Sequence, residues 1–145
     1  MNREELLRYK EQYRKTLVDE IIPYWLKYAV DESGAINNCL NEDGSLISKE
    51  RYIWSQGRAL WTFSKAYNTI EKDPAYLKAA ENIYGFLKKC TDTDGRMFFT
   101  VTEDGRQLQK RRYYFSETFA AIGCAEYYRA TGNEKALADA ETYFA

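Results

Sequence analysis

The sequence contains no histidine, and this absence limits the chemistry that its 145 residues can perform alone. Imidazole is the group that most often activates a nucleophile, transfers a proton near neutral pH or binds a metal ion. A chain without it cannot carry out histidine-based nucleophilic, acid–base or metal chemistry by itself. We also find no set of metal ligands at a recognisable spacing, so we expect no metal site.

Long apolar runs are missing as well. No stretch approaches the roughly 18 residues that a membrane-spanning helix requires, and the charged start, MNREE, is unlike a secretion signal. The three cysteines (residues 39, 90 and 124) lie too far apart for a zinc motif or a dense disulfide framework. We interpret them as reduced thiols and predict a cytoplasmic protein without a membrane partner.

Neither sign of charge dominates the chain. There are 21 Lys and Arg residues against 22 Asp and Glu residues, interspersed, which gives a net charge of -1. A nucleic-acid-binding protein usually needs a basic face, so we expect no nucleic-acid partner. What the chain does have is 45% hydrophobic residues and 16% aromatic residues, including 13 Tyr. These fractions predict a globular domain, and its aromatic rings are suited to packing or to stacking on ring-shaped ligands.

Apolar side chains recur at steps of three to four residues, which is typical of amphipathic helices. The first predicted helix covers residues 4–28, with Asn2 as N-cap, Glu5 completing a capping box, and a kink or new turn at Pro23. Further helices are expected at about 52–71, 74–89, 114–130 and from about 133 onward, with Gly132 ending the 114–130 helix. Short hairpins are expected within 33–48 and 97–105. The apolar side chains of 52–71 are spread too widely for a surface helix, so we expect this helix to be enclosed.

The pattern repeats after about 60 residues. At an offset of 61, EDG at 42–44 falls on EDG at 103–105, and RYIWS at 51–55 falls on RYYFS at 112–116. Each unit reads as a hairpin, an enclosed helix, a turn and an amphipathic helix. Helical hairpins bury their faces only against neighbouring hairpins, so such arrays need several units. We therefore predict an all-α chain in which residues 1–145 form two helical hairpins plus a leading helix, as part of a larger array.

The run YIWSQGRALW at 52–61 closely resembles the N-acylglucosamine 2-epimerase family, which comprises sugar 2-epimerases and related aldose–ketose isomerases on an (α/α)6 barrel. The likeness continues in YWL at 24–26, CL at 39–40, EDGR at 103–106, FSETF at 115–119 and YYRATG at 127–132. In contrast, GAINN at 34–38 departs from the Gly-Gly-aromatic-aromatic run of many relatives. The resemblance implies that residues 1–145 form the N-terminal part of such a barrel, with short β-hairpins in the loops between helices.

The resemblance also implies a reaction. A proton leaves C2 of a free sugar, such as an N-acylated hexosamine, and returns to the other face through an enediolate, without a redox cofactor or a required metal. Arg58 is our catalytic candidate, because a permanently charged guanidinium suits the negative charge of that intermediate. Tyr52 and Trp54 could contact a sugar hydroxyl and a pyranose face, and Gln56 is a weaker polar candidate. Glu117 could orient a sugar hydroxyl or pair with Arg58. The family's acid–base histidines lie on later hairpins, so we expect this chain alone to be inactive.

Other interpretations remain open from the sequence alone. Arg58 could pair with a carboxylate that joins two helices, Glu117 could simply complement a helix dipole, and Tyr52 and Trp54 could be core residues. The protein could be a mannose isomerase or a cellobiose 2-epimerase of the same family. It could also be a non-catalytic helical scaffold that binds a glycan or a protein. Besides a small sugar, the expected partner is a second copy, through homodimerisation or self-association at an exposed apolar edge.

Overall fold

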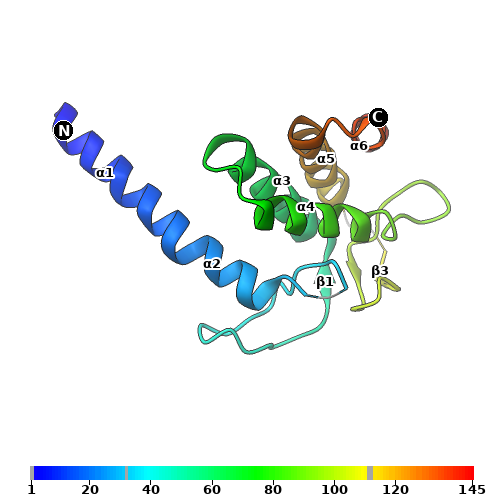
Figure 1. Ribbon diagram of the computed structural model, residues 1–145. Helices are drawn as coiled ribbons and strands as arrows, with labels where there is room; N and C mark the ends of the chain where they lie inside the picture. Colours follow the sequence, from blue (N-terminus) through cyan, green and yellow to red (C-terminus); the bar gives the residue numbers. More distant parts are fainter. Residues whose placement is uncertain (1, 32, 111–112) are drawn as a thin grey trace.

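The structure is a computed structural model that describes residues 2–31, 33–110 and 113–145 (Figure 1). The helical elements are α1 (Arg3–Thr16), the π-helical segment η1 (Leu17–Ile21), α2 (Ile22–Tyr24), a second π-helical segment η2 (Trp25–Ala29), α3 (Ile53–Thr69), α4 (Pro74–Leu87), α5 (Phe115–Thr131) and α6 (Glu134–Phe144). The strands are β1 (Arg51–Tyr52), β2 (Thr100–Val101) and β3 (Gln107–Gln109). No helix in these described ranges combines the length and the apolar character needed to cross a membrane.

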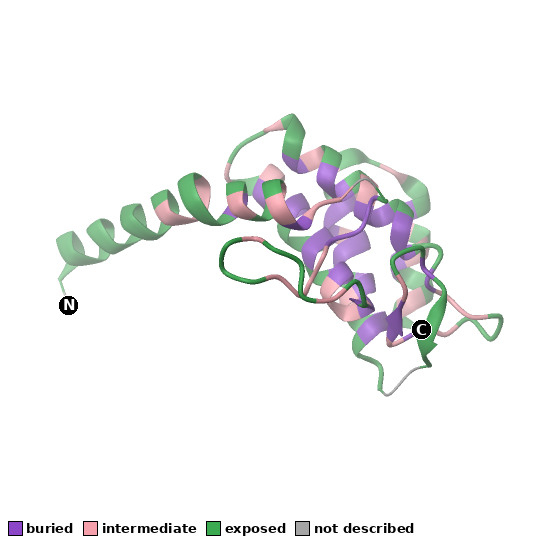
Figure 2. Cartoon of the chain, turned by 90° about the horizontal axis from the view of Figure 1, so that it is seen from below, coloured by how far each residue is buried: buried purple, intermediate pink, exposed green. Residues whose placement is uncertain are grey.

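The leading helix forms an arm that projects from the rest of the molecule (Figures 1 and 2). It begins as predicted, because the Asn2 side chain accepts the backbone N–H of Glu5 at 2.9 Å and the Glu5 carboxylate accepts the N–H of Asn2. Pro23 supplies no N–H, and the helix accommodates it with a π-helical turn on each side rather than ending there. No residue of α1 is buried, so the described part of the chain leaves this segment uncovered.

The core lies between α3 and α5, with α4 packed on α3 and α6 packed on α5. The buried side chains of α3, among them Ile53, Leu60 and Phe63, confirm that this helix is enclosed, and Figure 2 shows the buried residues gathered in the middle of the helical body, away from the leading arm. The two inner helices meet at Gly57 and Gly123. A Cβ atom on Gly57 would lie 2.5 Å from the carbonyl carbon of the facing helix, so only hydrogen permits this approach.

The hairpins between the helices share one turn design. Glycines 34, 44, 95 and 105 all have φ between +80° and +91°, a region that favours glycine. In each turn the glycine N–H donates to the carbonyl three residues earlier, as from Gly44 to Asn41 at 2.9 Å and from Gly105 to Thr102 at 3.0 Å. The first two turns are related to the second two by the offset of 61 residues, which confirms the repeat. Gly132 ends α5 at φ +70°, as predicted.

A small antiparallel sheet of order β1–β2–β3 joins the two repeats, and the sequence did not predict it. Arg51 pairs with Val101 and Tyr52 with Thr100, so the end of the first loop region is bonded to the second hairpin. The side chain of Arg51 is fully buried and forms an ion pair with Asp31. Its counterpart in the repeat, Arg112, lies outside the described residues.

Candidate functional site

Arg58 lines a cavity of about 400 Å³ between α3 and the leading helix. Apolar side chains of the leading helix, including Ile21 and Trp25, form one wall, and Trp54 and Phe63 of α3 contribute to the other. Among the described residues that line the cavity, Arg58 alone carries a charge. An exposed guanidinium at an apolar cavity is an arrangement that suits an anionic or strongly polar group of a small ligand.

Two aromatic rings contact the guanidinium. Its Cζ lies 4.6 Å from the ring centroid of Phe119 on α5 and 5.6 Å from that of Trp54 on its own helix. Within the described residues, no carboxylate comes within ion-pair distance of Arg58. The alternative in which Arg58 joins two helices through an ion pair is therefore not supported, because the described residues offer no carboxylate partner for it.

Gln56 is fully buried, and its side chain forms hydrogen bonds with the first hairpin. Its Oε1 accepts the N–H of Ile36 at 2.8 Å, and its Nε2 donates to the carbonyl of the same residue at 2.9 Å. No polar atom of Gln56 is left for a ligand. In the structure, Gln56 therefore holds the hairpin against α3, and its substrate contact stays a prediction.

Glu117 is buried as well, and it pairs with Arg96 rather than with Arg58. Its Oε1 accepts from Arg96 Nε at 3.0 Å and from the backbone N–H of Met97 at 3.1 Å. The hydrogen bond to Glu117 raises the pKa of Arg96 above its usual value. The alternative in which Glu117 pairs with Arg58 is wrong, because Arg96, which follows the Gly95 turn after α4, already pairs with this carboxylate.

The repeat accounts for both of these buried side chains. Gln56 and Glu117 are separated by 61 residues, and so are the two backbone positions that they hold, Ile36 and Met97. In both units, the first turn of the inner helix contributes a side-chain oxygen that accepts a hairpin N–H. The offset of 61 read from the sequence could have revealed this shared role, had it been applied to these positions.

The two predicted aromatic residues have different surroundings. Trp54 is half-buried and lines the Arg58 cavity. Tyr52 packs edge-on against Phe99 with ring centroids 5.6 Å apart, and it does not line that cavity. Of the five predicted site residues, the structure therefore brings only Arg58 and Trp54 together at the cavity.

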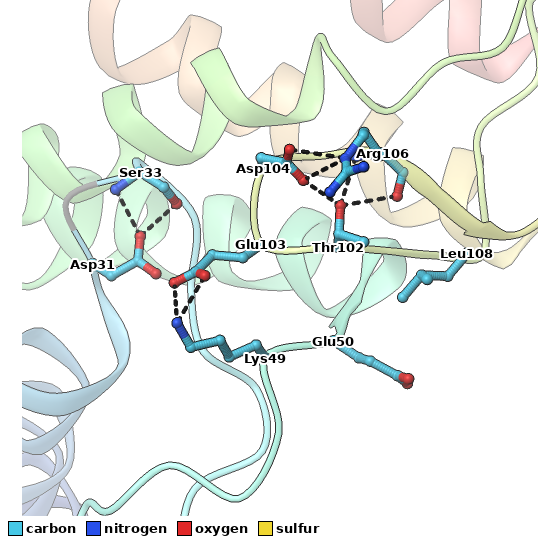
Figure 3. Close-up of a pocket in the computed structure, with 9 residues that line it drawn as sticks. All are labelled: Asp31, Ser33, Lys49, Glu50, Thr102, Glu103, Asp104, Arg106 and Leu108. Atoms are coloured by element: carbon cyan, nitrogen blue, oxygen red, sulfur yellow. Dashed lines mark hydrogen bonds and ion pairs between the residues drawn. The ribbon is translucent and has the colours of Figure 1, made fainter.

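A second hollow of about 940 Å³ lies between the tips of the two loop regions (Figure 3). It is larger and more strongly charged, but both of its cationic side chains are paired with carboxylates that line the same hollow. Lys49 reaches Glu103 at 2.9 Å, and Arg106 reaches Asp104 at 2.9 Å. Within the described ranges, no three His, Cys, Asp or Glu side chains gather as a metal ion would require. We therefore favour the Arg58 cavity as the functional site.

Comparison with known proteins decides the family. The sequence profile described as N-acylglucosamine 2-epimerase (GlcNAc 2-epimerase) matches residues 34–145. The chain belongs to the N-acylglucosamine 2-epimerase family. This membership confirms the resemblance that began with the run at 52–61.

The relatives within this family carry two different names. The chain is 31% identical to an N-acylglucosamine 2-epimerase of Bos taurus over 91% of its own length and 32% of the relative's. It is 32% identical to a cellobiose 2-epimerase of Ruminococcus albus over 92% of its length and 35% of the relative's. The chain spans about one third of the length of the curated relatives it matches.

A solved structure of the cellobiose 2-epimerase from Spirochaeta thermophila superposes with a TM-score of 0.87 at 30% identity. The match covers 98% of this chain and 36% of the solved chain. The fold prediction is therefore confirmed: the helical hairpins are an arc of an (α/α) barrel. We refer to α3 and α5, which form the main helix contact of this arc, as its inner helices, and to α4 and α6, which pack on them, as its outer helices.

Proposed function

We propose that the full-length protein containing these residues is a sugar 2-epimerase that transfers the proton at C2 of a free aldose. In the first step, a base removes the C2 proton, and the electron pair of the C–H bond moves into an enediolate. In the second step, a proton returns to the opposite face of C2, so the sugar gains or loses no atom or electron overall. The proposal assigns both proton carriers to residues outside 1–145, because this stretch contains no histidine.

One observation carries the proposal: Arg58 presents an exposed guanidinium without a carboxylate partner in the described structure. An arginine neutralised by a carboxylate would have less attraction for the developing oxyanion. A guanidinium that stays charged and keeps its N–H donors available can stabilise O1 or O2 as negative charge forms there. Trp54, on the same cavity wall, offers an apolar face on which a pyranose ring could pack. Tyr52 remains a proposed contact for a sugar hydroxyl at the start of α3.

For the substrate, we propose an N-acylated hexosamine or a disaccharide such as cellobiose. The names of the relatives support both, since N-acylglucosamine and cellobiose 2-epimerases match this chain at nearly equal identity. Mannose isomerisation by the same enediolate chemistry is the alternative within the family. The loop at 34–38, which is held by Gln56, lies beside the cavity through Ile36 and Asn38, so its sequence is one place where the choice between sugars could be made.

The proposal also covers location and association. All three cysteines are free thiols in the structure, with Cys90 and Cys124 buried, which supports the proposed cytoplasmic location. The exposed apolar side chains of the leading arm, such as Leu6 and Tyr13, support self-association or a homodimer. The net charge of -1 gives no support to a nucleic-acid partner.

The test measures exchange of the C2 proton with solvent deuterium, monitored by proton NMR in deuterium oxide. The full-length protein is incubated separately with N-acetylglucosamine, cellobiose and mannose. We expect exchange with at least one of them, and we expect Arg58→Ala to slow it by about a hundredfold or more, which is the usual range for removal of an oxyanion donor. Absence of exchange with every sugar would refute the epimerase proposal. In that case, sugar binding seen by calorimetry would support the non-catalytic scaffold.

A further inference from the structure

We propose that Phe119 is a positioning residue: its ring, together with that of Trp54, holds the guanidinium of Arg58 in place of a carboxylate. This inference rests on the proposed role of Arg58 at the enediolate. Phe119 itself is not assigned a contact with the sugar, and it does not line the cavity. It acts through Arg58 alone.

The geometry comes from two inner helices. Phe119 projects from α5 and Trp54 from α3, and their ring centroids lie 6.0 Å apart with planes inclined by 48°. The Cζ of Arg58 lies within 5.6 Å of both centroids and closer to Phe119, at 4.6 Å. Cations interact favourably with aromatic rings at about 6 Å or less. The guanidinium is therefore held by one ring of its own helix and by one ring of the next inner helix.

Aromatic rings and a carboxylate would hold this arginine with different consequences. A carboxylate would occupy N–H donors and cancel the charge that the reaction needs. A ring attracts the cation through its π-electron cloud and leaves the N–H donors along the edge of the guanidinium available. Holding Arg58 with Phe119 and Trp54 thus restricts the side chain while preserving its capacity to bind an oxyanion.

The backbone of Phe119 is itself held in place. The helices meet at Gly57, the residue before Arg58, where a Cβ atom would lie 2.5 Å from the carbonyl carbon of Phe119. This close approach sets the position of Phe119 relative to the neighbouring Arg58. The two residues are also separated by 61 positions, the repeat offset. The second unit therefore places an aromatic ring where the first unit places the cation, and the two equivalent side chains contact each other.

The first test is a set of substitutions in the full-length protein, assayed by C2 exchange. Phe119→Leu keeps an apolar side chain but removes the ring, and we expect kcat to fall about tenfold with little change in KM. Phe119→Tyr keeps the ring and should restore kcat to within about twofold of the parent protein. Phe119→Met serves as a second ring-free variant if the leucine variant does not fold. The matched control is Tyr128→Leu, which removes a half-buried ring from the same helix without contact to Arg58.

A double-mutant cycle separates positioning from packing. In the Arg58→Ala background, Phe119→Leu should change kcat by no more than about twofold, because the guanidinium that it holds is gone. If the two losses instead multiply, Phe119 acts independently of Arg58 and the inference is overturned. It is equally overturned if Tyr128→Leu lowers kcat as much as Phe119→Leu.

The second test needs no activity. The Nε–Hε resonance of Arg58, assigned by its loss in Arg58→Ala, should be shifted upfield by the two rings. We expect Phe119→Leu to move it toward the position of exposed arginines, and Phe119→Tyr and Tyr128→Leu to leave it in place. A resonance that does not respond to Phe119→Leu overturns the inference. If no sugar shows exchange, the proposed function fails, and this measurement still decides whether the rings hold Arg58.

Discussion

The contact between α3 and α5 can be tested with a pair of glycine substitutions. Gly57 and Gly85 both lie inside helices, so replacement of either by alanine removes the same helix penalty of about 1 kcal/mol. Gly57 is buried and Gly85 is exposed, so they differ in what a methyl group would meet. Around Gly85 there is no heavy atom within 4 Å of the added Cβ, whereas around Gly57 there are three backbone atoms at 2.5 to 2.7 Å.

The magnitude follows from these distances. Nonbonded carbon atoms rest at about 3.5–4.0 Å, so the Gly57→Ala methyl group would force the two helices apart by about 1 Å. The atoms in its way belong to the backbone of Phe119 and Ala120, which no rotamer change can move aside. Overpacking of this kind costs about 1–3 kcal/mol. Gly85→Ala should raise the free energy of unfolding by about 0.5–1 kcal/mol, since it gains helix propensity without a clash.

Urea denaturation of the full-length protein, followed by circular dichroism, measures both changes. We expect the Gly57→Ala midpoint to fall and the Gly85→Ala midpoint to rise relative to the parent protein. Because Gly57 precedes Arg58, the separated helices should also weaken the contact between Arg58 and Phe119 and slow C2 exchange. If Gly57→Ala proves as stable as Gly85→Ala, the close contact between the inner helices is wrong.

Three further predictions concern other parts of the chain. Gln56→Leu leaves a buried N–H and a buried carbonyl of the first hairpin unpaired, so it should lower the free energy of unfolding by about 3 kcal/mol in urea titrations; a smaller loss than 1 kcal/mol would contradict the assigned role. Burial tends to raise the pKa of Asp31, but hydrogen bonds from Ser33 and Arg51 outweigh it and lower that pKa below its usual value. The contribution of Asp31 to the free energy of unfolding is therefore present above its unfolded-state pKa near 4 and is lost as the pH falls through the lower folded-state pKa. In urea titrations at several pH values, Asp31→Asn should therefore make the free energy of unfolding depend less on pH below about pH 4. Burial raises the pKa of the two buried cysteines to about 12, so iodoacetamide at pH 8 should modify Cys39 first and the other two only after unfolding, as read by peptide mass spectrometry.

Local chemistry made most of the helices predictable. The capping box at Asn2, the proline at the first turn of α4 and the glycine after α5 mark helix ends in ways that depend only on neighbouring residues. The predicted range 52–71 therefore lies within two residues of α3 at each end. The Glu-Asp-Gly turns at 42–44 and 103–105 were likewise readable, because glycine favours the positive φ found at Gly44 and Gly105.

Contacts between the two units were not predictable in the same way. The strand pairing of β1 with β2 involves two residues on each strand, which is too short for an alternating pattern to emerge. Glu117 was expected either to orient a sugar hydroxyl or to pair with Arg58, and no sequence pattern singled out Arg96 as its partner. Arg96 follows the Gly95 turn after α4, 21 residues before Glu117, and reaches the carboxylate at 3.0 Å across the fold, whereas Arg58 lies on α3.

The equivalent positions 56 and 117 show why a repeat predicts a role better than it predicts a residue. The amide of Gln56 both accepts from and donates to the backbone of Ile36, so it satisfies the hairpin without help. The carboxylate of Glu117 can only accept, and a buried carboxylate needs a cation. That cation is Arg96, whose counterpart 61 residues earlier is Ala35. Gln56→Glu would therefore bury a carboxylate beside the carbonyl of Ile36, which it cannot satisfy as a donor. The two units therefore hold their hairpins in the same geometry with different side chains: an amide in the first unit and a carboxylate paired with an arginine in the second. Which side chain works depends on the residue before the hairpin N–H that it accepts, Ala35 in the first unit and Arg96 in the second.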